Sequence, residues 1–192
     1  MNVGLITHEE LARRAAAGDR VAFATLVRTF GPQLAAIARA GGVAPGDVED
    51  VVQETFVSAW RAAARYDSSR PFRVWLFQIA LNKSRDWRRR RKVRHLFFTA
   101  TSLETPEAQA VEAKDAGPEA VAHDRHLERL LGTAIEDLPE DLKQPFLLVA
   151  LAEFTYSEAG AVLGMSLKTI EGRVARARRR LQAALPQIDQ SR

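Results

Sequence analysis

The chain has 192 residues and no cysteine, so it has room for one or two small domains and excludes disulfides and thiolate-based sites. Its formal net charge is only +4, but its cations are clustered, which indicates an anion-binding surface. The opening MNVGLITHEE lacks a signal-peptide pattern, and the longest apolar run, residues 146–152, is too short to span a bilayer, so we expect a soluble, cytoplasmic protein without membrane insertion.

Two helices are predicted at the amino-terminal end. Thr7 and Glu10 have the spacing of a capping box at the head of a first helix, which ends near Gly18. A second helix covers residues 20–39, because its apolar residues recur at helical spacing and two glycines follow it. We expect both to pack under the next two helices as an all-α domain.

A third helix is predicted from Asp47 to about Arg61. Asp47 follows a Pro-Gly pair and precedes an apolar-periodic run, which predicts that its side chain caps the helix. The expected buried stripe is Val48, Val52, Thr55, Phe56 and Ala59. Asp50, Gln53 and Glu54 lie off this stripe and form one acidic and amide patch. Taken alone, such a patch is more often an ordinary solvated face.

A fourth helix is predicted to begin at Pro71, because proline suits a first helical position. Apolar residues cover most of its surface: Phe72, Val74, Trp75, Leu76, Phe77, Ile79, Ala80 and Leu81. The remaining strip carries groups that can bond bases and phosphates, namely Gln78, Asn82, Arg85 and Arg89. Trp75 lies at the edge of this strip, where it could stack on a base, although a tryptophan at core spacing more often belongs to the core.

The fourth helix ends in a dense basic run. Residues 85–94 carry seven cations against the single carboxylate of Asp86. Like charges at this density repel each other until a polyanion neutralises them, so nucleic acid is the expected partner.

The segments DVEDVVQETFVSAW (47–60) and FRVWLFQIALNKSRDWRRRRK (72–92) resemble conserved region two of the bacterial sigma factors, of the small extracytoplasmic-function type. The resemblance implies that Asp50, Gln53 and Glu54 dock on the clamp-helix coiled coil of the largest subunit of core RNA polymerase. It also implies that the loop 66–73, with Asn82, captures an extruded base of the minus-ten element on the non-template strand. The minus-ten contacts expected from the strip and the resemblance together are Tyr66, Ser68, Arg70, Arg73, Trp75, Gln78, Asn82, Arg85 and Arg89. Ser58 departs from the relatives that place a lysine there.

The composition changes after Arg94. Residues 99–124 are acidic and rich in Ala, Glu, Thr and Pro, with little periodicity, so we expect a flexible linker. This divides the chain into a first domain (1–95), a linker (96–124) and a second domain (125–192). His123 and His126 have a spacing that could share a metal, but no third ligand is near, so we expect neither a metal site nor a cofactor.

The second domain is predicted to contain a helix-turn-helix. Two amphipathic helices come first, one ending at Leu138 and the other covering residues 142–153. Thr155 and Glu158 then form a capping box for a short helix to residue 163, followed by a left-handed turn at Gly164. Ser166 caps a longer helix from residue 167 to about 185, which Pro186 stops. Short helix, glycine turn and longer basic helix are typical of this motif.

The last helix separates into two faces. Its predicted buried face consists of Ile170, Val174, Ala177, Leu181 and Leu185. The opposite face consists of Lys168, Gly172, Ala175, Arg176 and Arg179. Small residues there allow the backbone to approach a groove floor, and the cations reach bases or phosphates. The alternative is an ordinary amphipathic surface helix, which the neighbouring caps and turn make less favoured.

TYSEAGAVLGMSLKTIEGRVARARRRL (155–181) resembles sigma region four, the module that reads the minus-thirty-five element. The contacts expected there from the exposed face and the resemblance together are Lys168, Thr169, Glu171, Gly172, Arg173, Arg176 and Arg179. Glu171 departs from relatives with a basic residue at this place. A carboxylate in the major groove accepts from cytosine and repels phosphate.

The sequence therefore predicts an all-α protein of two small helical domains joined by a flexible linker. The resemblance of both halves implies an alternative sigma factor that directs core RNA polymerase to promoter DNA and captures the melted non-template strand. It also implies an anti-sigma protein partner. No Gly-rich phosphate loop or paired-acid site is present, so no enzyme activity is expected.

Two other functions remain open. A helix-turn-helix regulator that is not a polymerase subunit would have no use for the acidic patch. A sigma-mimicking decoy that only binds an anti-sigma protein would not need the basic runs at 88–94 and 176–180.

Overall fold

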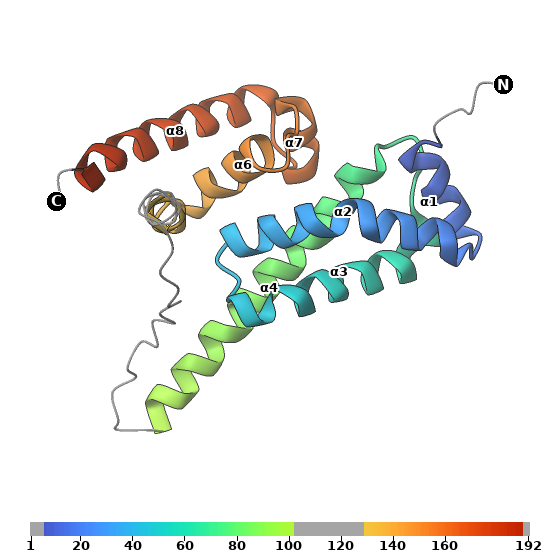
Figure 1. Cartoon of the computed structure of the whole chain (residues 1–192), viewed down its shortest axis with the longest axis horizontal. Helices are drawn as coiled ribbons and strands as arrows, with labels where there is room; N and C mark the ends of the chain where they lie inside the picture. The colour runs from blue at the N-terminus through green and yellow to red at the C-terminus, as the bar shows by residue number, and fades with distance from the viewer. Residues whose placement is uncertain (1–5, 102–128, 190–192) are drawn as a thin grey trace, which may run out of the picture.

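The structure is a computed structural model that describes residues 6–101 and 129–189, and within these ranges every regular element is a helix. The amino-terminal group contains α1 (His8–Ala16), α2 (Arg20–Ala40), α3 (Val48–Ala62) and α4 (Phe72–Thr101). The carboxy-terminal group contains a helix at residues 129–136, then α6 (Glu140–Ala150), α7 (Tyr156–Leu163) and α8 (Leu167–Asp189) (Figure 1). The all-α prediction is confirmed. Most of the predicted linker, with His123 and His126, lies outside the described residues.

Side-chain caps set the starts of α1 and α2. The Thr7 hydroxyl accepts from the backbone N–H of Glu10 at 3.2 Å. The Glu10 carboxylate pairs with Arg13, so only the Thr7 half of the predicted capping box forms. Asp19, which the sequence analysis did not single out, caps α2.

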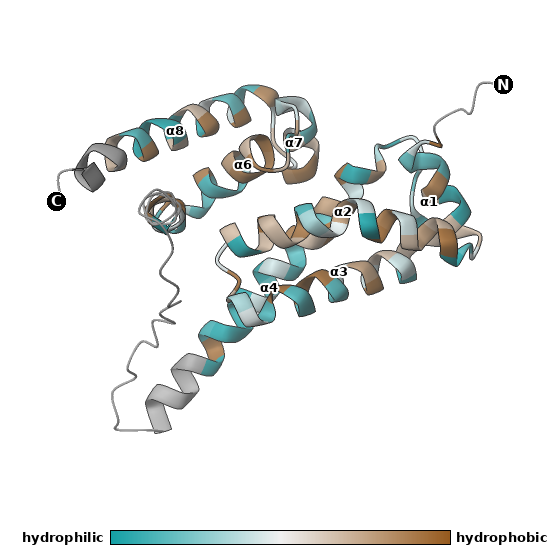
Figure 2. Cartoon of the chain, in the orientation of Figure 1, coloured by the Kyte–Doolittle hydropathy of each residue, from teal (hydrophilic) through white to brown (hydrophobic). Residues whose placement is uncertain are grey.

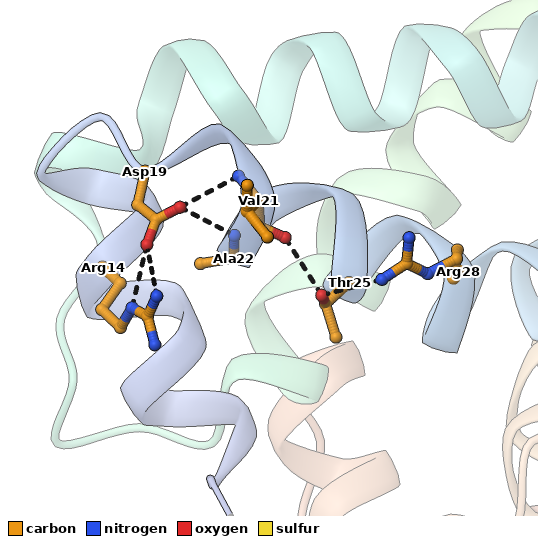
Figure 3. Close-up of polar contacts among 6 residues, drawn as sticks. All are labelled: Arg14, Asp19, Val21, Ala22, Thr25 and Arg28. Atoms are coloured by element: carbon orange, nitrogen blue, oxygen red, sulfur yellow. Dashed lines mark hydrogen bonds and ion pairs between the residues drawn. The ribbon is translucent and has the colours of Figure 1, made fainter.

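Asp19 makes both a helix cap and an ion pair (Figure 3). Its Oδ1 accepts from the N–H groups of Val21 and Ala22 at 2.9 and 3.0 Å. Its Oδ2 accepts from the Nε and Nη2 of Arg14 at 2.9 and 2.6 Å, which ties α1 to α2. The Ala22 N–H and the Arg14 side chain together lower the pKa of Asp19. The negative charge at the head of α2 also complements the helix dipole.

Helix α2 forms the centre of the amino-terminal core. By length and composition alone it is apolar enough to cross a membrane. Its buried residues are Ala22, Leu26, Phe30, Leu34, Ile37 and Ala38. They face α1, α3 and α4, as expected for the core helix of a globular bundle.

The start of α3 differs from the prediction. Asp47 has φ −106° and ψ −2°, and its side chain makes no capping hydrogen bond. It ends a 3₁₀ turn, Pro45–Asp47, and donates its backbone N–H to Ala44 O at 2.9 Å. A side-chain cap needs an extended backbone at the capping residue, and the 3₁₀ turn has already removed that conformation.

The buried stripe of α3 also differs at one position. Val51 is buried instead of Val52, which is half-buried. Val51 packs in a small cluster with Trp87 of α4, and Trp87 is itself buried. The prediction did not place Trp87 in the core, and it therefore did not expect Trp87 to cover the Val51 side of α3.

Helix α4 is longer than predicted. It begins at Phe72, with Pro71 O accepting from the N–H groups of Val74 and Trp75, and continues to Thr101 rather than ending near Lys92. Its first half is buried, as predicted, through Phe72, Val74, Leu76, Phe77, Ala80 and Leu81. Trp75 and Ile79 are only half-buried. Figure 2 shows α4 becoming hydrophilic along the half that leaves the bundle.

The helix-turn-helix forms as predicted. Thr155 and Glu158 make a complete capping box, and Gly164 ends α7 with φ +66°. Ser166 Oγ accepts from the Thr169 N–H at 3.3 Å at the start of α8. Helix α8 does not stop before Pro186, since its backbone stays helical to Asp189. Helix α6 starts two residues earlier and ends three residues earlier than the predicted 142–153.

The carboxy-terminal core confirms the predicted buried face of α8. Ile170, Val174, Ala177 and Leu181 are buried, while the Leu185 side chain lies outside the described part of the chain. Helix α7 contacts α4, and Phe77 and Phe154 belong to one hydrophobic cluster that spans both groups. The two helical groups therefore touch across α4.

Candidate nucleic-acid and protein interfaces

The predicted protein-binding patch lies on the outer face of α3. Asp50, Gln53 and Glu54 are all exposed, so the structure brings them together as the helical spacing predicts. They border a shallow hollow that also includes Val57, Ser58, Arg61 and Lys83. The exposed Val57 gives this hollow an apolar floor beside its carboxylates. Carboxylates beside an exposed apolar side chain suit a protein partner that carries cations next to an apolar residue.

Cations from α4 border this patch, which the sequence analysis did not foresee. Glu54 Oε2 lies 3.9 Å from Lys83 Nζ and 3.4 Å from Arg90 Nη2. Exposed pairs of this kind contribute at most about 1 kcal/mol. Glu54 can therefore exchange these cations for those of a partner at little cost.

The loop between α3 and α4 is closed by its own side chains. The Tyr66 hydroxyl donates to Arg70 O at 2.6 Å, and Asp67 Oδ1 accepts from the Ser69 N–H at 2.9 Å. The Glu9 carboxylate of α1 accepts from the Phe72 N–H at 3.3 Å. These bonds join the loop to itself and to α1.

Three aromatic rings gather behind this loop. Tyr66 lies 5.5 Å from Phe72 and 5.1 Å from Trp75 between ring centroids, and Phe72 lies 5.6 Å from Trp75. Burial, followed by the nearby carboxylates of Glu9 and Asp67, raises the pKa of Tyr66 to about 12. Its hydroxyl therefore remains a hydrogen-bond donor at neutral pH. Trp75 joins the cluster but stays half-exposed, so it combines a core position with an accessible ring.

Five of the predicted minus-ten residues have exposed side chains: Ser68 and Arg70 in the loop, and Asn82, Arg85 and Arg89 on α4. Arg85 Nη1 donates to Asn82 Oδ1 at 3.3 Å, which orients that amide. The exposed guanidiniums continue along α4 into its basic run. The exposed residues of α4 between 82 and 94 can therefore contact a polyanion.

Two predicted minus-ten residues instead contact the carboxy-terminal group. Arg73 Nη2 donates to Ala152 O at 2.7 Å, and Gln78 Nε2 donates to Ala161 O at 2.9 Å. Nothing in the sequence indicates these contacts, because the partners are 79 and 83 residues apart.

The predicted groove-facing side of α8 is open. Lys168, Glu171, Gly172, Arg176 and Arg179 are exposed. A Cβ added at Gly172 would meet open space, so the backbone there is accessible to a groove floor. The remaining two predicted contacts are half-buried.

Those two residues, Thr169 and Arg173, also bond within their own domain. Thr169 Oγ1 lies 2.8 Å from Ser166 Oγ at the helix cap. Arg173 Nη1 donates to Asp141 O at 3.3 Å. To contact DNA, these two side chains would have to break these bonds or form bonds to DNA in addition to them.

Gly160 in α7 has a packing role that the sequence analysis did not recognise. A Cβ at this position would lie 2.7 Å from Met165 O. Met165 N–H in turn donates to Gly160 O at 2.9 Å, which closes the turn. The absence of a side chain therefore lets α7 and the turn approach closely enough to fix the angle at which α8 is presented.

Sequence reasoning missed the core position of Trp87 and the ion pair between Arg88 and Glu140. Trp87 follows the buried Ala80 and Ser84 at helical spacing, so periodicity could have found it. Arg88 pairs with Glu140, which is 52 residues away, and no local signal predicts such a pair.

Within residues 6–101 and 129–189, no three His, Cys, Asp or Glu side chains are grouped as metal ligands would be.

Two family models match the chain. The description of one is Sigma-70 region 2, over residues 26–94, and that of the other is Sigma-70 region 4, over residues 128–181. Among curated proteins, RNA polymerase sigma factor CnrH of Cupriavidus metallidurans is 45% identical over 177 residues, covering 91% of this chain and 92% of its own. The ECF RNA polymerase sigma-E factor of Escherichia coli K12 is 30% identical over 175 residues, covering 90% and 91%.

Solved structures give the same result. The structure of CnrH in complex with the cytosolic domain of CnrY has a TM-score of 0.72 and 36% identity, covering 94% of this chain and 97% of that one. The sigma factor RpoE from Bartonella quintana, crystallised with the anti-sigma factor NepR, has a TM-score of 0.66 and 24% identity, covering 85% and 96%. The latter likeness shows the shared fold.

Proposed function

This chain belongs to the extracytoplasmic-function RNA polymerase sigma factors, and we propose that its α3 patch docks on core polymerase while α4 and α8 contact the promoter. The observation that carries this assignment is the separation of chemistry on the surface. An exposed carboxylate and amide patch lies on α3, and exposed guanidiniums lie on α4 and α8. A protein partner and a nucleic-acid partner can therefore be bound at the same time.

The minus-ten surface combines a stiff loop with a basic helix. The bonded loop 66–70 and the half-exposed Trp75 offer a preformed aromatic edge for an extruded base. Asn82, oriented by Arg85, supplies an amide with a donor and an acceptor. Flipping a base costs a few kcal/mol, and stacking with hydrogen bonds can offset this cost. The exposed arginines of α4 then hold the phosphates of the separated strand.

The minus-thirty-five surface is the exposed face of α8. Arg176 and Arg179 lie one turn apart on that face, and Gly172 lies one turn before Arg176. A guanidinium can bond a guanine edge with two hydrogen bonds, and the absence of a side chain at Gly172 allows a close approach. Glu171 lies beside these cations and favours cytosine among the bases that it can reach.

A regulatory protein partner follows from the relatives. CnrH was solved with the cytosolic domain of CnrY, and the Bartonella RpoE with the anti-sigma factor NepR. We infer that an anti-sigma protein likewise controls this chain. We place the action of the present chain in the cytoplasm, where polymerase and chromosome meet. We assign this chain no covalent chemistry, in keeping with a family of regulatory subunits.

The alternative functions fit these surfaces less well. A regulator that binds duplex DNA without docking as a sigma subunit has no use for the α3 hollow, which Asp50, Glu54 and the exposed Val57 line together. A decoy for an anti-sigma protein has no use for a groove-facing side of α8 that is exposed and cationic.

Retention of core polymerase tests the docking patch. The double substitution Asp50→Lys with Gln53→Ala reverses one charge and removes one amide on the patch. It should weaken binding to core polymerase on the order of tenfold, because a like charge at a docking surface slows association and destabilises the complex. Binding is measured by titrating core enzyme into labelled full-length protein.

The matched control is Asp137→Lys with Gln182→Ala, which makes the same chemical change at exposed positions of the carboxy-terminal group. It should leave core binding unchanged. If the patch variant and the control bind core equally well, α3 is not the docking surface.

A further inference from the structure

Helix α4 begins without a side-chain cap from the residues just before it. The first amides of a helix have no partner within the helix and need an acceptor from outside it. Pro71, the residue before α4, has no side-chain acceptor, and the guanidinium of Arg70 can only donate. The acceptor for the Phe72 N–H comes from another element of the fold.

Glu9 of α1 supplies this acceptor. Its carboxylate accepts from the Phe72 N–H at 3.3 Å, although the two residues lie 63 positions apart in the chain. The bond is partly shielded from water, because Glu9 is half-buried and Phe72 is buried. A carboxylate at the start of a helix also complements the positive end of the helix dipole. Glu9 therefore caps α4 from a different helix.

Helix α1 is anchored independently of this bond. Three of its side chains are buried in the amino-terminal core: Leu11, Ala12 and Ala15. The pair between Arg14 and Asp19 ties the other end of α1 to α2. Figure 1 shows α1 beside the loop that leads into α4, and α1 contacts both α4 and the 3₁₀ turn Ala63–Arg65 before that loop. The Glu9 carboxylate is therefore presented from a helix with its own fixed place in the core.

The first turn of α4 carries two of the three rings that gather behind the loop. Phe72 and Trp75 lie on this turn, and Tyr66 packs against both of them. Phe72 also lies 5.8 Å from Phe30 of α2 between ring centroids. If the first turn of α4 frayed, Phe72 and Trp75 would lose their fixed orientation toward Tyr66. The cap on the Phe72 N–H therefore controls the aromatic edge of the proposed minus-ten surface.

The bonds within the loop do not replace this cap. The Tyr66 hydroxyl donates to Arg70 O, and the Ser69 N–H donates to Asp67 Oδ1, so both bonds begin and end before α4. The Glu9 carboxylate also lies near the Tyr66 hydroxyl, because burial and then this carboxylate are the main causes that raise the pKa of Tyr66 to about 12. One carboxylate thus faces both ends of the loop.

Glu9 lies outside the part of the chain that matches sigma region 2. That match covers residues 26–94, which include the loop and most of α4 but begin after α1. The minus-ten contacts predicted from the sequence, from Tyr66 to Arg89, lie inside the same range. A role for α1 in this surface therefore follows from the fold of the present chain.

We propose that Glu9 is a positioning residue for minus-ten recognition: its carboxylate holds the first turn of α4 and so sets the orientation of Trp75, on whose exposed edge an extruded base stacks. This inference rests on the proposed function of the loop and α4. Glu9 acts through Phe72 and Trp75 and touches no DNA itself. A surface that keeps its binding shape in only a fraction of the molecules binds more weakly by that fraction.

Hydrogen exchange of the Phe72 amide tests the bond without DNA. Glu9→Ala removes the acceptor, so this amide should exchange about tenfold faster, as measured by NMR on the full chain. Glu9→Gln keeps a neutral acceptor, which bonds more weakly than a carboxylate, and should give an intermediate rate. The control is Glu10→Ala, the same change at the next residue of α1, whose carboxylate pairs with Arg13; it should leave the rate unchanged. Equal rates in the natural protein and Glu9→Ala would overturn the proposal.

Binding of two matched single strands tests the consequence for recognition. The first is a strand that the natural chain selects from a random single-stranded pool, and the second has an abasic site at the base whose removal weakens binding most. The ratio of the two affinities separates base capture from phosphate contacts. In Glu9→Ala this ratio should fall about fivefold, because the aromatic edge is correctly oriented in fewer molecules. The affinity for the abasic strand should not change, since the exposed arginines of α4 still bind its phosphates. Glu9→Gln should recover part of the ratio.

Three results of the strand experiment would contradict the proposal: an unchanged ratio in Glu9→Ala, an equal fall in Glu10→Ala, or an equal loss of affinity for both strands. The last would mean that Glu9 only stabilises the fold. Urea unfolding of each variant verifies that the DNA measurements are made on folded protein. A natural chain that binds the intact and abasic strands equally would refute base capture itself, and the role of Glu9 in it, whereas the exchange rates would still measure the cap on α4.

Discussion

Two glycines of the carboxy-terminal group have opposite surroundings, although both lie inside helices. Gly160 of α7 faces the carbonyl of Met165 at a distance that leaves no room for a Cβ, whereas Gly172 of α8 faces open space. The same substitution should therefore have opposite effects at the two positions. Helix propensity favours alanine at both by about 1 kcal/mol, so packing decides the sign.

Gly160→Ala should destabilise the protein by about 1–3 kcal/mol, because the added methyl forces the α7 turn apart. Gly172→Ala should stabilise it by up to about 1 kcal/mol, while weakening binding to minus-thirty-five duplex DNA, where the methyl obstructs the groove floor. Urea unfolding and duplex titrations measure the two effects. An increase in stability for Gly160→Ala would show that the backbone near Met165 can move aside for the added methyl group without loss of stability.

The Asp19 cap gives a pH-dependent prediction. Asp19→Asn keeps an acceptor for the Val21 and Ala22 N–H groups but loses the Arg14 ion pair, so it should destabilise less than Asp19→Ala, which loses both. Because folding lowers the pKa of Asp19 from 3.8, its charged form stabilises the fold at all pH values above the unfolded pKa. That contribution is lost as pH falls through the folded pKa.

Denaturant midpoints measured between pH 7 and pH 2.5 test this. The difference in denaturant midpoint between the natural protein and Asp19→Asn should be constant down to about pH 5 and shrink below pH 4. A difference that stays constant throughout the acid range would mean that the carboxylate charge has no part in the cap.

At the scale of elements, α8 carries the most specific DNA prediction. Arg176→Ala should cost about 1–3 kcal/mol of binding at one base pair of the minus-thirty-five element, because a guanidinium that bonds a base edge discriminates at that pair alone. Competition titrations with single-base variants of the duplex measure the loss. Arg180→Ala, a neighbouring exposed cation on the same helix, provides the control and should weaken all sequences equally. A uniform loss for Arg176→Ala would instead assign it to a phosphate.

Local chemistry explains which elements the sequence predicts well. The α7–α8 unit was predicted with its capping box, its left-handed Gly164 and its Ser166 cap, because each signal acts within three or four residues. Asp47 shows the limit of such signals. Its type and position suit a cap, but the preceding 3₁₀ turn sets its backbone and removes the capping bond.

Tertiary contacts decided the remaining features of the elements. Val51 rather than Val52 is buried because Trp87, from the far half of α4, covers that side of α3. The exposure of Asp50, Gln53 and Glu54 was predicted correctly, because it follows from the helical period of α3 alone.

At the scale of the whole molecule, the two helical groups meet through contacts that no sequence pattern predicts. Arg73 and Gln78 were predicted to face DNA, and their side chains do lie at the surface of the amino-terminal group. The structure shows that the carboxy-terminal group then covers them. Residue types that bind bases and phosphates also bind carbonyls and carboxylates, so composition alone cannot distinguish the two partners.

Initiation in vitro tests the account as a whole. The purified full-length chain, free of any inhibitor, is mixed with core RNA polymerase and a library of promoter fragments, and the transcripts are sequenced. The account predicts initiation from a subset of fragments that share both a minus-ten and a minus-thirty-five motif, with initiation falling in the Asp50→Lys, Gln53→Ala variant. Absence of initiation on every fragment, with core polymerase that is active with another sigma factor, would contradict it.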